Sequence, residues 1–326
     1  MKRFTAILLL AAVMLSLAAC GSSEPEPTPD PHEGMIYVNT GANYEWVDLA
    51  EGVPVSALTE NDFETGEDGI PVYTGEAYET RLGIDVSFYQ GDIDWQKVAE
   101  QGVEFAMIRC GYRGSSEGEL FVDEKFEQNM QGAIDAGLDV GVYFFSQSMG
   151  AIEAAEEALF VLDLIKDYKI TMPVAFDWEP LEDSRAEDID RDELTASALV
   201  FCEMVKDAGY TPCVYLYRYI AYYDYDLSRL ADFPLWIGAP GEKLDFYYEA
   251  AIWQFSFTSR IDGIDADVDM NLQFYAPGSD PACPTPEPSQ TPEPSQTPEP
   301  TVSPEPSAWK PSSPHGKNGP QHPGGQ

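Results

Sequence analysis

The stretch 174-VAFDWEP-180 joins an apolar run directly to two carboxylates. Residues 174–176 predict a buried strand, yet carboxylates are rarely buried unless they are paired or used in a reaction. Alternate residues of a strand point to the same face, so Asp177 and Glu179 should share one face, about 7 Å apart along the chain, with Trp178 on the other. The pair is therefore either a solvated strand end or two acids placed for chemistry.

On both sides of this stretch, residues 81–276 alternate between apolar, strand-like runs and amphipathic, helix-like runs. Buried strands that alternate with helices favour a parallel sheet, and eight of them favour an α/β barrel of the TIM-like (β/α) kind. A flavodoxin-like open sheet is the alternative, but it needs fewer strands and a phosphate-binding loop, and neither GxGxxG nor GxxxxGK occurs. The predicted strands are 83–89, 104–112, 139–146, 173–179, 212–217, 234–239, 251–256 and 268–274, and the clearest helices are 94–102, 123–137, 151–166 and 192–209.

The segments outside this region have other compositions. Residues 1–20 hold a basic start, an apolar run and 17-LAAC-20, which resembles a lipoprotein signal peptide with Cys20 as the lipidated residue. An ordinary secretory signal that ends in a cysteine is the alternative. Residues 21–34 predict a disordered tether, residues 35–80 a small β-containing extension, and residues 277–326 a low-complexity tail with a Pro-rich spacer.

Charge and histidine content exclude several classes of protein. The net charge of −39 argues against nucleic acid as a partner, because phosphate binding needs Lys and Arg. His32, His315 and His322 are the three histidines, and all lie outside residues 81–276. That region therefore lacks the imidazole needed for a Ser-His-Asp or Cys-His nucleophile and for a His-based zinc site. We expect no metal and no cofactor, with proton transfer left to Asp, Glu, Tyr, Lys and Cys.

The cysteines other than Cys20 match no zinc-binding spacing. Cys202 and Cys213 would meet if the helix and the strand that carry them pack together, so a disulfide is one possibility. Buried thiols are the favoured interpretation for the four cysteines Cys110, Cys202, Cys213 and Cys283.

Carboxylates recur at the predicted strand ends. Asp85 lies on the first strand, Asp177 and Glu179 on the fourth, and Asp269 on the eighth. The first and last strands become neighbours when a barrel closes, so these acids should converge on one pocket. Paired carboxylates whose pKa values are pushed apart are typical of enzymes that cleave glycosidic bonds. Aromatic residues that would stack on sugar rings near these strand ends are Tyr89, Tyr143, Phe145, Tyr217, Trp236 and Trp253.

Each of these features also has a purely structural interpretation. An Asp at a strand end more often serves a turn, as we expect of Asp267, and a strand aromatic is more often part of a core. Only the coincidence of several acids at strand ends in a His-free barrel favours catalysis.

Seven segments, in order, resemble a known enzyme family across about residues 83–275. They resemble glycoside hydrolase family 25, the Chalaropsis-type lysozymes, which implies an irregular (β/α)5(β)3 barrel and N-acetylmuramidase activity on the glycan strands of peptidoglycan. The segments are 83-GIDVSFYQGDIDW-95, 105-FAMIRCGY-112, 136-AGLDVGVYFF-145, 174-VAFDWE-179, 235-LWIGA-239, 252-IWQFS-256 and 267-DVDMN-271.

The resemblance also implies roles for individual residues. Glu179 would be the general acid/base, and Asp177 would stay ionised to stabilise developing positive charge or orient the substrate's N-acetyl group. Asp85 and Asp269 would hold the network and tune its pKa values. Tyr143 matches an active-site tyrosine, although the histidine that follows it in many relatives is absent here.

Other functions remain open at this point. The domain would otherwise be an endo-N-acetylglucosaminidase or chitinase, a catalytically silent glycan-binding module, or a structural surface lipoprotein. We expect a monomer on the outer face of a bacterial membrane, in the zone of the cell wall, anchored through the lipid on Cys20.

Overall fold

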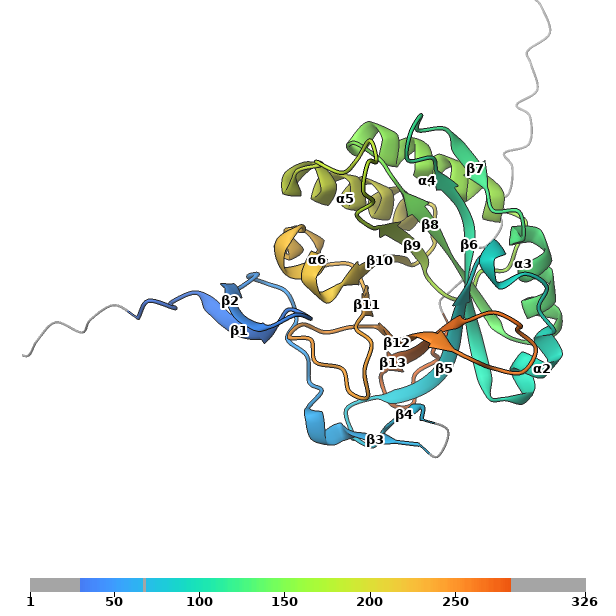
Figure 1. Cartoon of the computed structure of the whole chain (residues 1–326), viewed down its shortest axis with the longest axis horizontal. Coiled ribbons are helices and arrows are strands. Elements are labelled where there is room, and N and C mark those ends of the chain that lie inside the picture. The colour runs from blue at the N-terminus through green and yellow to red at the C-terminus, as the bar shows by residue number, and fades with distance from the viewer. Residues whose placement is uncertain (1–29, 67–68, 283–326) are drawn as a thin grey trace, which may run out of the picture. The chain divides into compact units, whose positions relative to one another are not determined.

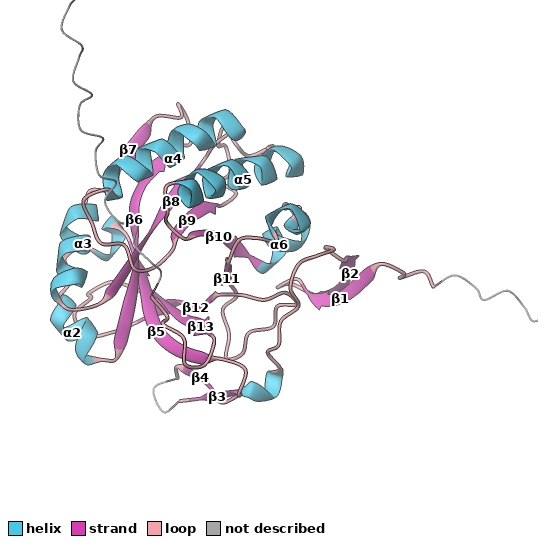
Figure 2. Ribbon diagram, turned by 180° about the vertical axis from the view of Figure 1, so that it is seen from behind, coloured by secondary structure: helices cyan, strands magenta, loops and turns pink. Residues whose placement is uncertain are grey.

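The computed structural model describes residues 30–66 and 69–282. The predicted signal peptide with Cys20, nearly all of the predicted tether and the tail beyond residue 282 lie outside the described residues. Within them, eight strands close into a barrel in the order β5-β13-β12-β11-β10-β9-β8-β6, and β6 pairs back with β5 (Figures 1 and 2). The barrel prediction is confirmed and the open-sheet alternative is wrong. The strands are β5 (Glu79–Val86), β6 (Val103–Arg113), β8 (Asp139–Ser146), β9 (Val174–Trp178), β10 (Pro212–Tyr217), β11 (Leu235–Gly238), β12 (Ile252–Ser259) and β13 (Val268–Tyr275).

Helices follow the first five barrel strands and pack on their outer faces. The predicted helix ends at Gly102, Gly137 and Gly209 are confirmed, since all three glycines have the positive φ that commonly ends a helix. In the part of the chain that the structure describes, no helix is long and apolar enough to cross a membrane. The helices are α2 (Trp95–Glu100), α3 (Phe126–Asp135), α4 (Ala151–Ile165), α5 (Arg191–Asp207) and α6 (Arg218–Tyr223), and a short strand β7 (Leu120–Val122) pairs with the end of β6.

The sheet is mixed rather than parallel as predicted, because β13 runs antiparallel to both of its neighbours. Residues 260–267 join β12 to β13, and this connection is too short for the crossover that a parallel pair needs. The reversal places the start of β13 beside the end of β5. Asp269 consequently lies directly opposite Asp85 in the strand register.

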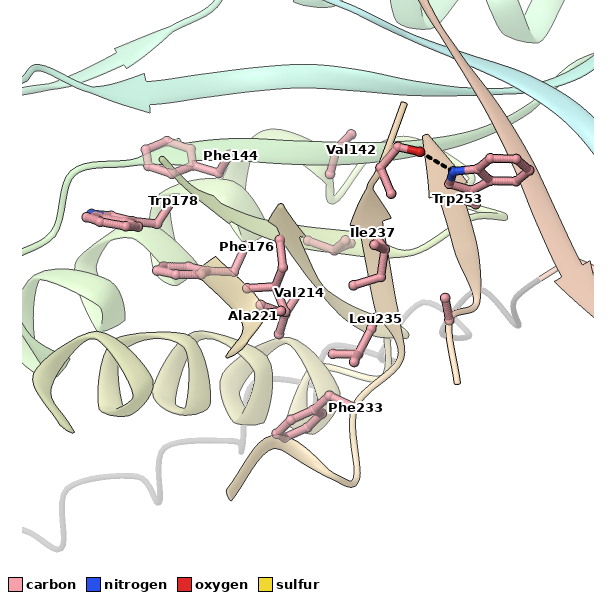
Figure 3. Close-up of a cluster of buried hydrophobic side chains, with 14 of the residues drawn as sticks. Val142, Phe144, Phe176, Trp178, Val214, Ala221, Phe233, Leu235, Ile237 and Trp253 are labelled. Carbon is pink, nitrogen blue, oxygen red and sulfur yellow. Dashed lines mark hydrogen bonds between the residues drawn. The ribbon is translucent and has the colours of Figure 1, made fainter. Parts of the chain in front are cut away.

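The strands divide their side chains between two apolar layers. The outer layer packs against the helices, and Figure 3 shows part of it on β8 to β11, including Phe176 and Trp178. The inner layer fills the barrel. A Cβ on Gly83 would lie 2.3 Å from the ring of Phe105, so glycine is needed there to admit that ring. The buried inner cluster is Phe105, Met107, Met172, Ala175, Cys213, Tyr215, Trp236 and Ile252.

The N-terminal extension forms two hairpins, β1 (Met35–Asn39) with β2 (Tyr44–Asp48), and β3 (Phe63–Thr65) with β4 (Pro71–Tyr73). The second hairpin covers outer faces of β12 and β13, strands that no helix follows. Its buried Phe63 ring lies 5.3 Å from Trp253 and 6.3 Å from Phe274 between centroids. The extension thus supplies part of the apolar cover that helices give elsewhere in the barrel.

Three of the predicted thiols lie within the described residues, and all are buried. Cys110, Cys202 and Cys213 are thiols rather than disulfides, and the Cys202 Sγ lies 3.8 Å from the carbonyl oxygen of Cys213. The favoured interpretation is confirmed for these three, while Cys283 lies outside the described residues.

Candidate active site

A cavity of about 220 Å³ opens at the end of the barrel where the parallel strands finish. All four predicted acids lie on its wall, so the structure brings them together. The residues that line the cavity are Asp85, Ser87, Tyr89, Gln90, Arg109, Tyr143, Phe145, Asp177, Glu179, Tyr215, Tyr217, Trp236, Gln254 and Asp269.

The end of β9 positions the first pair of acids. Asp177 and Glu179 both face the cavity, whereas Trp178 packs in the outer apolar layer (Figure 3), as strand alternation predicts. The Tyr217 hydroxyl donates to Oε2 of Glu179 at 3.1 Å, and the Gln147 amide donates to its backbone carbonyl at 3.0 Å. Glu179 is therefore held just after the end of β9, and its Oε1 accepts no hydrogen bond from any described residue.

The second pair of acids, Asp85 and Asp269, is organised by two amides. Asn271 Nδ2 and Gln254 Nε2 each donate to Oδ2 of Asp85 at 2.8 Å, and Gln254 also donates to Oδ2 of Asp269 at 3.3 Å. The indole of Trp236 donates to Oδ1 of Asn271 at 2.8 Å. Because an indole N–H can only donate, this bond orients the amide of Asn271 with its NH2 toward Asp85.

A matching bond fixes the second amide. The Tyr215 hydroxyl donates to Oε1 of Gln254 at 2.6 Å, which leaves Nε2 to face the acids. Two aromatic donors, Tyr215 and Trp236, therefore act through two amides on a single carboxylate oxygen of Asp85. This network supports the ionised form of Asp85, because hydrogen bonds to a carboxylate favour its charge.

Burial works in the opposite direction on all four acids. It raises the pKa of Asp85 to about 6, against the two amide hydrogen bonds, and burial together with the charges of Asp85 and Glu179 raises the pKa of Asp269 to about 8. Burial and the charge of Asp85 raise the pKa of Glu179, while the Tyr217 hydrogen bond lowers it. The cluster consequently retains protons toward neutral pH, which general acid catalysis requires.

Asp177 departs from the expectation that it stays ionised. It is 3% exposed, and among the described residues its Oδ1 has no hydrogen-bond partner. Burial and the charges of Glu179 and Asp85 raise its pKa well above the ordinary value, and only the guanidinium of Arg109 opposes them. The structure therefore favours the protonated form of Asp177, because burial without hydrogen bonds penalises the charged form.

Five of the six aromatic residues predicted to stack on sugar rings line the cavity, Phe145 among them. Tyr89 is 69% exposed, Tyr143 and Tyr217 are half-buried, and Trp236 is buried beneath them. Trp253 does not join them: it is 0% exposed, faces away from the barrel interior and donates to the carbonyl of Ala239 at 2.7 Å (Figure 3). The sugar-stacking prediction for Trp253 is wrong, because its strand position faces the second hairpin.

Sequence reasoning missed the polar residues that support the acids. Arg109 donates to Asp123 at 2.7 Å and lies 5.4 Å from the Tyr89 ring centre, so it is held at the edge of the cavity. Asp267, as expected, stays outside, in an exposed ion pair with Arg260. The available signal was a polar residue interrupting an apolar run, as Arg109 does in 104-EFAMIRCGY-112 and Gln254 does in 251-AIWQFS-256.

Comparisons with known proteins agree with this geometry. The family model described as glycosyl hydrolases family 25 matches residues 84–264, more than half of the chain. The autolytic lysozyme of Clostridium acetobutylicum is 28% identical over 192 residues, which cover 58% of this chain and 54% of that protein. The chain thus spans about half the length of this curated relative.

Solved structures show the same fold. A family 25 glycosyl hydrolase from Bacillus anthracis matches with a TM-score of 0.50 and 26% identity, over 60% of this chain and 89% of that one. The modular autolysin LytC from Streptococcus pneumoniae matches with a TM-score of 0.54 and 23% identity, over 74% of this chain and 57% of that one. The barrel, its acid-lined cavity and the family match lead to one conclusion: the chain belongs to glycosyl hydrolases family 25.

Proposed function

We propose that the protein is a peptidoglycan hydrolase of the lysozyme type. It would cleave the β-1,4 bond between N-acetylmuramic acid and N-acetylglucosamine. The observation that carries this proposal is the convergence of four buried or half-buried carboxylates with raised pKa values in one cavity lined with aromatic residues. Relatives named as a lysozyme and an autolysin support the same substrate class.

Glu179 is the proposed general acid. Its raised pKa keeps the carboxyl protonated nearer to neutral pH, so that it can protonate the leaving glycosidic oxygen. The Tyr217 hydroxyl holds Oε2 and leaves Oε1 for the substrate. The reverse transfer, from water to Glu179, would complete hydrolysis.

Asp177 is the proposed partner of the oxocarbenium-like centre. Its buried carboxyl must pass its proton to water in the open cavity before it can stabilise positive charge, and Arg109 favours the ionised form. A covalent intermediate and attack by the substrate's own acetamido oxygen are two routes to the product. Because Asp177 and Glu179 come from one strand, the acetamido route fits better, and both routes predict retention of the anomeric configuration. An inverted first product, seen by NMR, would contradict both.

One experiment tests the function and the residue together. The full chain, a Glu179→Gln variant and a Glu182→Gln control would each be incubated with purified peptidoglycan. Released fragments would be reduced with borohydride and identified by mass spectrometry. Reduced muramic acid ends from the wild type and the control, but not from Glu179→Gln, would support the proposal.

Other outcomes assign other functions. Reduced glucosamine ends would make the protein an endo-N-acetylglucosaminidase, and cleavage of chitin in place of peptidoglycan would make it a chitinase. No release from any variant, with binding retained, would leave a glycan-binding module. No release and no binding would leave the structural surface role.

We also propose that the protein acts as a monomer. Lipidation of Cys20, which would hold it on the outer face of the membrane, rests on the sequence pattern alone. A Cys20→Ala variant should lose incorporation of labelled fatty acid and leave the membrane fraction. Unchanged membrane association of that variant would contradict the anchor.

A further inference from the structure

The first hairpin of the extension has one buried face and one aromatic face. Ile36, Val38 and Val47 alternate with the aromatic residues and are buried. Tyr37, Tyr44 and Trp46 are 57%, 52% and 44% exposed on the other face, and His32 stacks on Trp46 with centroids 3.9 Å apart. We call His32, Tyr37, Tyr44 and Trp46 the aromatic strip.

The aromatic strip is a continuous surface rather than a set of scattered residues. Tyr37 lies 5.3 Å from Trp46 and 5.7 Å from Tyr44 between ring centroids. Tyr37 and Trp46 are also directly opposite each other in the strand register. Exposed aromatic side chains gathered in this way mark interaction sites, since burying them on a partner is favourable and they lose little conformational entropy.

A short chain of contacts joins the aromatic strip to the cavity. Tyr217, which binds the proposed acid, is followed directly by Arg218, and Arg218 donates to the carbonyl of Asp245 at 3.3 Å. The side chain of Asp245 in turn accepts from Asn39 at 2.9 Å and from Tyr44 at 3.0 Å. The strip is therefore connected at Tyr44, through Asp245 and Arg218, to the cavity residue Tyr217.

Helix α6 provides a second link between the two regions. The Tyr223 hydroxyl, at the end of α6, donates to Glu45 of the hairpin at 2.6 Å. Tyr219 of the same helix is 55% exposed, and its ring centroid lies 4.7 Å from that of Tyr223, with the rings tilted. Helix α6 lies next to the β1–β2 hairpin (Figure 1). Because Glu45 alternates with Tyr44 and Trp46 along β2, its bond to Tyr223 holds the hairpin face opposite the aromatic strip.

The charges around the aromatic strip indicate the chemistry of its ligand. Asp30, Glu33, Glu45 and Asp48 are exposed on or beside the hairpin, and the segment 30–66 contains neither Lys nor Arg. An acidic ligand would be repelled, which disfavours the chain's own Pro-rich segment 284–300 with its repeated Glu. Uncharged sugars present apolar faces to aromatic rings and hydroxyl donors to carboxylates, so they fit both features.

We propose that the aromatic strip is a second glycan-binding surface, which holds uncharged sugar residues of the polymer beside the catalytic cavity. The identity of that polymer as peptidoglycan rests on the proposed function. The binding itself does not depend on hydrolysis.

The test measures binding of the full chain to purified, insoluble peptidoglycan, with Glu179→Gln present in every protein to prevent cleavage. Adding Tyr37→Thr and Trp46→Thr removes the two central rings but keeps residues that favour strands. We expect binding to weaken roughly tenfold, since loss of part of one buried aromatic surface is enough for that change. A matched control, Ile152→Ala with Leu159→Ala, removes exposed apolar side chains from α4 and should leave binding unchanged.

A conservative Trp46→Tyr variant should retain most of the binding, which separates loss of a ring from loss of the hairpin fold. Unchanged binding of the Tyr37→Thr/Trp46→Thr protein, or an equal loss in the α4 control, would overturn the proposal. Retained peptidoglycan binding with lost affinity for a peptide of residues 284–300 would overturn it in favour of the Pro-rich segment. Because binding is read without catalysis, failure of the proposed hydrolysis would appear separately, as wild-type protein that binds but releases no fragments.

Discussion

The two ends of the barrel interior differ in how their charged side chains are paired, although the same strands form both ends. Near its start β5 carries Arg81, which is 5% exposed and bonded to Asp139, Gln273 and the carbonyl of Pro281. Near its end, the same strand carries Asp85, which shares its cavity with three more carboxylates and has no ion pair with any described residue. One end is electrostatically complete and closes the barrel. The other end holds like charges close together, an arrangement that suits proton transfer and opposes stability.

We call the end of the barrel with Asp85 and the other three carboxylates the acidic end. The largest expected effect on activity is there. Glu179→Gln should lower the rate of peptidoglycan hydrolysis by about 100-fold to 10,000-fold, because the amide cannot donate an acidic proton. Stability should stay equal or rise, since a buried group with a raised pKa is replaced by a neutral one. Initial rates and thermal unfolding measure the two effects, and Glu182→Gln, an exposed acid nearby, is the control. A Glu179→Gln protein that unfolds more easily would break the contrast between the ends.

The end of the barrel with Arg81 should behave in the opposite way: a substitution there should lower stability and leave activity unchanged. Arg81→Ala leaves the buried Gln273 and the partly buried Asp139 without their cation, so we expect a loss of about 3 kcal/mol in the free energy of unfolding. The kcat of the protein that remains folded should be unchanged. Urea denaturation with rate measurements checks this, beside Lys166→Ala, which breaks an exposed ion pair and should change the free energy of unfolding little. Equal stability of the two variants would show that the Arg81 cluster contributes little.

The pH dependence of stability should also arise from the carboxylates at the acidic end. The pKa of Asp85 is raised to about 6 and that of Asp269 to about 8, whereas an unfolded Asp titrates near pH 4. The folded protein therefore binds more protons than the unfolded chain between these values. Their stabilising effect is complete below about pH 4 and is lost as pH rises through about 6 and then about 8.

An Asp269→Asn variant tests the part of this pH dependence that lies between pH 6 and pH 8. The fall in melting temperature between pH 6 and pH 8 should become shallower, while an exposed Asp265→Asn control should follow the wild type. A melting temperature that rises over this range, or an unchanged slope in Asp269→Asn, would contradict the assignment.

The smallest effect concerns the hydrogen bond on the proposed acid. The Tyr217 hydroxyl lowers the pKa of Glu179, so Tyr217→Phe should move the alkaline limb of the kcat/KM profile to higher pH. The maximal rate should change by less than about tenfold, because the acid itself remains and only its pKa is adjusted. Tyr210→Phe, outside the cavity, is the control. A shift to lower pH would mean that Tyr217 acts on another group.

The acidic end was largely predictable from sequence, and the physical reason is strand geometry. Alternation placed Asp177 and Glu179 together, and barrel closure brought Asp85 to Asp269. The reversed direction of β13 and the choice between Trp236 and Trp253 were not predicted from the residues. Both tryptophans lie in short apolar strands, so the pattern alone does not distinguish them. Only Gln254, next to Trp253, indicates which face of β12 points to the carboxylates of the cavity.

The extension was the least predictable region. Its short apolar pieces show that strands form, but their partners lie about 190 to 210 residues later in the chain, as for Phe63 with Trp253 and Phe274. No local pattern records such a pairing. The protonated state favoured for Asp177 was also hidden, because it depends on the loss of water and hydrogen bonds in the folded cavity.

The reversed last strand has a consequence for the order in which the protein is made. Asp85 takes its two amide donors from Gln254 and Asn271, which follow it by 169 and 186 positions. When the ribosome has added Glu179, it has still to add β12 and β13, which carry the two amides that orient Asp85. A nascent or prematurely ended chain therefore carries the proposed acid without its organised surroundings, and cutting activity is expected only once synthesis has passed β13.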